Sequence, residues 1–88
     1  MTSPCFAAFI LSTPPENGTH FGFTTPRALG KAVVRNRIRR RMREAVRVEQ
    51  HLFPAGVSIV FNPRRTVLTA EFESLRKEVA RVAARCNQ

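Results

Sequence analysis

The segment KAVVRNRIRRRMREAVR, which runs from Lys31 to Arg47, has the apolar spacing of an amphipathic helix. At about 100° per residue, five apolar side chains fall on one face of this helix: Val34, Ile38, Met42, Ala45 and Val46. A face of this length can pack on a sheet. We therefore expect a docked helix from Lys31 to about Val48 rather than a free basic arm.

Positive charge is concentrated in the same segment. The 88-residue chain has 15 Lys and Arg residues against six acids, all of them Glu, for a net charge of +9. Residues 31–47 contain eight of these cations and a single acid, and they carry +7 of that charge. The acid is Glu44, four residues after Arg40, so little repulsion is relieved within the helix. We expect the compensating charge to come from a polyanionic partner.

The kind of cation favours RNA as that partner. Seven of the eight cations are Arg, whose planar guanidinium binds phosphate through two hydrogen bonds and stacks on bases. Nearly every polar position of the helix is Arg, which suits recognition of backbone and shape in folded RNA better than base reading in DNA. A membrane-surface helix is expected to carry Trp, Phe or Leu on its apolar face, and this helix does not. A solvent-exposed charged helix without a partner is the other alternative.

Three strands and a second helix are predicted around this segment, in the order β-β-α-β-α of an α+β fold. Their predicted ranges are Cys5–Ser12, His20–Thr25 and Val57–Asn62 for the strands and Ala70–Cys86 for the helix. The first two strands are expected to run antiparallel, with a loop between them that contains Asn17 and Gly18. Thr69 is the expected N-cap of the second helix.

Length and composition fit a single domain over residues 1–88. No apolar run reaches the roughly 20 residues that span a bilayer, and the start lacks the basic flank of a secretion signal, so we expect a cytoplasmic protein. Cys5 and Cys86 are expected to be free thiols. Together with His20 and His51 they match no zinc-binding spacing, and we expect the protein to bind no metal.

An ordered run of residues adds specificity to this interpretation. FGFT at residues 21–24, followed by LGKAVVRNRIRRRMREAVR at residues 29–47, closely resembles the signature of the bacterial ribonuclease P protein subunit. The Arg-Asn-Arg core, the basic pair after it and the Arg-Glu pair all stand in register. Residues 57–84 fit the tail of the family, so the resemblance covers nearly the whole chain.

The resemblance implies a small α-β sandwich in which the Arg-rich helix forms a left-handed β-α-β crossover, although pattern alone predicts a right-handed one. It also implies the RNA-binding subunit of ribonuclease P, an endonuclease that removes the 5′ leader from precursor tRNA. The catalytic RNA subunit performs the hydrolysis with Mg²⁺. The protein supplies no catalytic residue and no cofactor of its own. It binds the catalytic RNA and holds the leader in a cleft between sheet and helices.

Site residues follow from the match position by position. The residues expected to bind RNA are Lys31, Arg35, Asn36, Arg37, Arg39, Arg40, Arg43 and Arg47. Within this set Arg37 and Arg40 are assigned mainly to the catalytic RNA. The residues expected at the leader cleft are Phe9, Arg35, Asn36, Arg39 and Arg43.

The chain departs from the family pattern at its start. It begins at about the first strand, whereas the family normally has a basic N-terminal segment and a phenylalanine-bearing helix that forms one wall of the cleft. Three explanations stay open: the segment is lost, the start of the sequence is misassigned, or the segment is trimmed. His20, Ala28 and Asn62 stand where the family commonly has Arg, Lys and Arg, which lowers the charge of the cleft. A structural RNA-binding module such as a ribosomal protein is the main alternative. A protein-only nuclease using His20 and His51 is disfavoured because the chain has no Asp.

Overall fold

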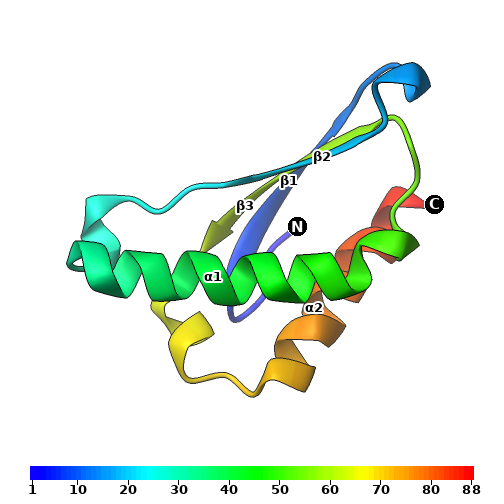
Figure 1. The fold of residues 1–88 in the computed structure, drawn as a ribbon. Coiled ribbons are helices and arrows are strands. Elements are labelled where there is room, and N and C mark those ends of the chain that lie inside the picture. The colour runs from blue at the N-terminus through cyan, green and yellow to red at the C-terminus, as the bar shows by residue number, and fades with distance from the viewer.

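The computed structural model describes residues 1–88, and its elements follow the predicted order (Figure 1). These are β1 (Phe6–Ser12), β2 (Thr19–Phe23), α1 (Ala32–Glu49), β3 (Val57–Pro63) and α2 (Phe72–Cys86). Four short 3₁₀ turns connect them, at Pro15–Asn17, Arg27–Leu29, Gln50–Leu52 and Arg65–Leu68. All five predicted elements are present, and β1, α1 and β3 begin and end within one residue of their predicted bounds.

The sheet has the strand order β1-β3-β2. β3 lies in the middle, antiparallel to β1 with Phe9 opposite Val60, and parallel to β2 with Phe21 opposite Ile59. β1 and β2 therefore run in opposite directions, as predicted, but they are not neighbours. The expected β-α-β unit is present as β2, α1 and β3. Its left-handed sense stays a prediction.

The loop between β1 and β2 explains why the two strands do not pair. Thr13 N donates to Gly56 O at 2.9 Å, and Gly56 N donates to Gly18 O at 2.9 Å. The start of β3 is thus bonded to both ends of this loop. Gly56 has φ +84°, and a Cβ there would lie 3.0 Å from Thr13 O. Only glycine fits this conformation and this close approach.

Both helices cover the same face of the sheet, as Figure 1 shows. The alternation of each strand turns Phe6, Ile59 and Phe61 toward the helices, and all three are fully buried. Residues of α1 and α2 complete this core: Ile38, Met42, Ala45, Val46, Leu75, Val79, Val82 and Ala83. The predicted apolar faces of both helices are therefore the packed ones. The opposite face of the sheet has no helix over it.

The second helix begins later than predicted. It starts at Phe72, and Thr69 is not its N-cap, because Thr69 closes the 3₁₀ turn Arg65–Leu68 and its hydroxyl bonds to Thr66 O at 3.5 Å. Arg41 of α1 accounts for the shift. Its guanidinium donates to the carbonyl oxygens of Leu68 and Ala70 at 3.1 and 2.8 Å. These carbonyls are bonded to α1, and the helix starts only after them.

Candidate nucleic-acid interface

The buried apolar side chains of α1 and its cations lie on different sides of the helix. Ile38 and Met42 are fully buried against the sheet and α2. The predicted RNA-binding residues all lie on α1 or at its N-cap, which is Lys31. Those exposed are Lys31, Asn36, Arg37, Arg40, Arg43 and Arg47, and those partly exposed are Arg35 and Arg39. The structure therefore gathers the set on one rigid element.

The stripe formed by Arg35, Arg39 and Arg43 follows one side of α1, because residues four apart are neighbours on a helix. This side is turned toward β2 and the segment after it. Arg35 Nη1 donates to Thr25 O at 3.5 Å, and Arg43 lines a groove against β2. Asn36 Oδ1 accepts a hydrogen bond of 2.6 Å from Arg39 Nη2, which orients that guanidinium. The predicted stripe is thus brought together with Asn36.

Phe9 lies elsewhere. It is 57% exposed on the face of the sheet that no helix covers, because its neighbours in β1 point into the core. Val60 of β3 lies opposite Phe9, and Gly22 of β2 lies opposite Val60, so the three residues form one row across the sheet. Gly22 has no side chain, so the row leaves a flat apolar shelf around Phe9. The structure does not bring Phe9 together with the arginine stripe, and its part in leader binding stays a prediction.

Ion pairs neutralise few of these cations. Glu44 pairs with Arg47, at 2.6 Å from Oε1 to Nη2 and 3.0 Å from Oε2 to Nε, and not with Arg40. The hydrogen bond from Arg47 lowers the pKa of Glu44 below its ordinary value and raises that of Arg47. The other two ion pairs of the chain both join Arg76 to glutamates, Glu49 and Glu73. Every other cation of α1 lacks a carboxylate partner.

Two arginines have positions that the sequence did not reveal. Arg41, inside the basic run, has both terminal nitrogens bonded to backbone carbonyls. Arg65 joins the site instead: its Nη1 donates to Leu29 O at 2.6 Å and lies beside Gly30, close to the first turn of α1. No sequence signal marks Arg65, because 36 residues separate it from the carbonyl that it contacts.

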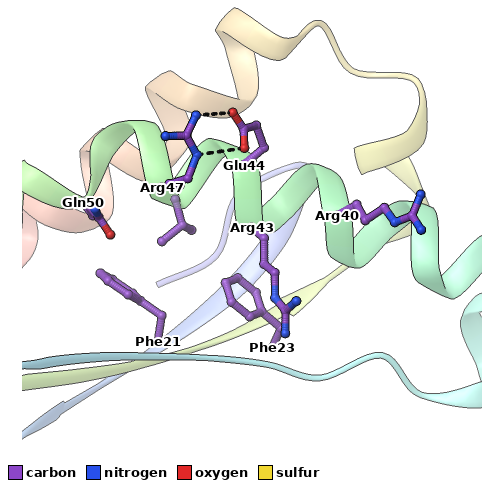
Figure 2. Close-up of a pocket in the computed structure, with 8 residues that line it drawn as sticks. Phe21, Phe23, Arg40, Arg43, Glu44, Arg47 and Gln50 are labelled. Carbon is purple, nitrogen blue, oxygen red and sulfur yellow. Dashed lines mark hydrogen bonds and ion pairs between the residues drawn. The ribbon is translucent and has the colours of Figure 1, made fainter.

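A groove of about 610 Å³ runs between β2 and the C-terminal half of α1 (Figure 2). It is lined by Phe21, Phe23, Arg40, Arg43, Glu44, Val46, Arg47 and Gln50. The phenylalanines come from β2 and the other residues from α1 and the turn after it. Arg40, Arg43 and Arg47 are predicted site residues. On the sequence alone, Phe21 and Phe23 could be a stacking surface for unpaired nucleotides, but core positions are the preferred interpretation for most of the phenylalanines.

No helix of the chain combines the length and apolar character that a membrane crossing needs. No three His, Cys or Glu side chains come together as a set of metal ligands.

Known proteins with similar sequences are bacterial ribonuclease P protein components. One from Symbiobacterium thermophilum is 45% identical over 70 residues, which are 80% of this chain and 61% of the relative. One from Chloroflexus aggregans is 43% identical over 68 residues, which are 76% of this chain and 50% of the relative. The chain thus spans about half to three fifths of the length of these relatives.

Solved structures share the fold. The ribonuclease P protein from Thermotoga maritima matches with a TM-score of 0.82 and 24% identity, over 97% of this chain and 80% of that one. The Staphylococcus aureus protein matches with a TM-score of 0.74 and 22% identity, over 94% of this chain and 78% of that one. The family model described as Ribonuclease P matches residues 2–87. The chain therefore belongs to the ribonuclease P protein family.

Proposed function

We propose that this chain is the RNA-binding subunit of a bacterial ribonuclease P, and that it acts in the cytoplasm. It binds the catalytic RNA subunit and assists the endonucleolytic removal of the 5′ leader from precursor tRNA. The observation that carries the proposal is the row of exposed arginines on α1, of which only Arg47 has a carboxylate partner, in a member of this family.

The catalytic RNA is proposed to bind along the exposed side of α1. Arg37 and Arg40 point away from the core and can each bind a phosphate through two hydrogen bonds. Packing of Ile38 and Met42 fixes the helix, so little conformational freedom of the backbone is lost when RNA binds. Arg65 and Lys31 extend the positive surface past the first turn of α1.

The resemblance implies a leader cleft between sheet and helices, but its expected aromatic residue, Phe9, lies on the uncovered face. The 5′ leader is therefore proposed to lie as a single strand on that face of the sheet. Phe9 offers an exposed ring there, and Val60 and Gly22 keep the surface around it flat. Unpaired bases stack on exposed aromatic rings with little sequence preference, which suits a leader of variable sequence. Arg35 and Arg39 of α1, whose stripe is turned toward β2, are proposed to bind leader phosphates.

Hydrolysis itself is assigned to the RNA subunit and its Mg²⁺. The chain is proposed to contribute positive charge, which lowers the repulsion between two polyanions, the catalytic RNA and the precursor tRNA. This predicts that the protein matters most at low magnesium, where the metal alone screens the phosphates poorly.

Reconstitution tests the proposal. A bacterial ribonuclease P RNA and a precursor tRNA are incubated with and without the protein across a magnesium series. We expect cleavage at low magnesium only when the protein is present, and no cleavage by the protein alone. The absence of stimulation would contradict the proposal. Recovery of mainly ribosomal RNA after crosslinking in cells would identify a structural RNA-binding module instead.

A further inference from the structure

The groove between β2 and α1 has a rigid aromatic floor. The Phe21 ring packs edge-on against Phe53, with centroids 5.0 Å apart, and the Phe23 ring stacks on Phe61 at 5.7 Å. Both phenylalanines are nevertheless partly exposed, because the groove opens above them. Its volume of about 610 Å³ lies within the roughly 300–1,000 Å³ of small-ligand sites. The two rings, fixed by this packing, thus offer an apolar surface to a planar group.

The rim of the groove is cationic. Arg40 and Arg43 have no carboxylate partner, whereas Arg47 is neutralised by Glu44. Figure 2 shows the Arg43 side chain extending from α1 toward Phe23. An entering planar group would therefore meet aromatic carbon below and a guanidinium at its side. The amide of Gln50, at the end of the groove, adds a hydrogen-bond donor and acceptor.

These features together fit one kind of occupant. A nucleotide combines a planar base, which stacks on phenylalanine, with a phosphate, which pairs with free guanidiniums. The base must be unpaired, because bases inside an RNA helix are stacked and their edges lie in grooves. A peptide strand added to the edge of β2 would leave Arg40 and Arg43 without compensating charge.

We propose that this groove binds one unpaired nucleotide of the RNA partner, its base against Phe21 and Phe23 and its adjacent phosphate on Arg40 and Arg43. The inference rests on the proposed RNA-binding function and specifies a contact within it. The groove lies on the helix side of the sheet, so it is a different surface from the shelf around Phe9.

Two RNA duplexes of equal length test this inference, one fully paired and one carrying a single bulged 2-aminopurine nucleotide. The full-length protein is titrated with each, and anisotropy and 2-aminopurine fluorescence are recorded. We expect the bulged duplex to bind about 5- to 150-fold more tightly, as stacking of one base on an aromatic ring implies. We also expect the fluorescence to change on binding.

Phe23→Leu removes the aromatic surface and keeps an apolar side chain, so most of the preference should be lost. Phe72→Leu, the same change on α2 away from the groove, is the matched control and should keep it. Thermal unfolding verifies that both variants fold. If Phe23→Leu does not fold, the ring resonances of Phe21 and Phe23 in the wild-type protein give the answer, since they should shift with the bulged duplex while those of Phe72 do not.

Equal binding of the two duplexes, or a preference that survives in folded Phe23→Leu, would overturn the inference. So would RNA-independent dimers in sedimentation, combined with no preference, which would assign the groove to a second copy of the chain. Stimulation of precursor-tRNA cleavage is measured on the same preparation. Stimulation without a bulge preference refutes the groove alone, whereas failure of both refutes the proposed function.

Discussion

Removal of a single guanidinium from α1 should change both the affinity for RNA and its salt dependence. Of the eight cations in residues 31–47, Arg47 is ion-paired and Arg41 is bonded to carbonyls, which leaves six for phosphates. Six phosphate contacts give a slope of log K against log salt of roughly −4 to −5. Arg40→Gln should move this slope toward zero by about 0.7–0.9. At constant salt it should weaken binding by about 1.5–3 kcal/mol, the range for a charged hydrogen bond.

Fluorescence anisotropy with a complex of bacterial ribonuclease P RNA and precursor tRNA, which together present all six contacts, measures both quantities. Over about 50 to 200 mM salt the wild-type affinity should fall roughly 250- to 1,000-fold. Arg81→Gln makes the same charge change on an exposed position of α2 and is the matched control. It should leave the slope almost unchanged. A wild-type slope shallower than about −2, or equal effects of the two variants, would refute the assignment of RNA binding to α1.

Changes at Glu44, Arg41 and Cys5 give three further predictions. Glu44→Gln releases Arg47 from its ion pair, so RNA affinity should rise and the salt slope should steepen by up to about 0.9, measured in the same titration. Arg41→Met removes two hydrogen bonds to carbonyls and should lower the free energy of unfolding by about 1–3 kcal/mol in urea while leaving the salt slope unchanged. Burial raises the pKa of the Cys5 thiol above its ordinary 9.0, with a further contribution from a hydrogen bond to Glu78. As pH rises, the Cys5 thiol therefore ionises first in the unfolded chain, and the free energy of unfolding should fall above pH 9.0. In urea unfolding at pH 8 and 10, the free energy of unfolding of Cys5→Ala should fall less between the two pH values than that of the wild-type protein.

The helices and strands were predictable because their signals are local. The apolar spacing of α1 identifies its packed face from 17 consecutive residues, and the alternation in β3 does the same for Ile59 and Phe61. The cations of the site share one short segment, so their clustering also follows from the sequence. Predictions of this kind need no knowledge of which elements meet.

The remaining features depend on contacts between distant segments. The position of β3 between β1 and β2 is tied to hydrogen bonds from Gly56 to both ends of a loop about 40 residues earlier. The late start of α2 depends on Arg41, almost 30 residues before the carbonyls it holds. The groove needs Phe23 of one element beside Arg43 of another. Composition and periodicity carry no information about which distant segments come into contact.

The crowding of like charges on α1 raises the question of why the helix is stable before RNA binds. Four pairs of cations without a carboxylate partner stand four residues apart, each repelling by about 0.2–0.5 kcal/mol, or roughly 0.8–2 kcal/mol together: Lys31–Arg35, Arg35–Arg39, Arg39–Arg43 and Arg37–Arg41. Full burial of Ile38 and Met42 alone contributes about 3–6 kcal/mol. Packing therefore exceeds repulsion, and the helix is formed in the free protein. RNA then removes an existing repulsion instead of ordering a disordered arm, so the binding energy of the arginines is available for affinity.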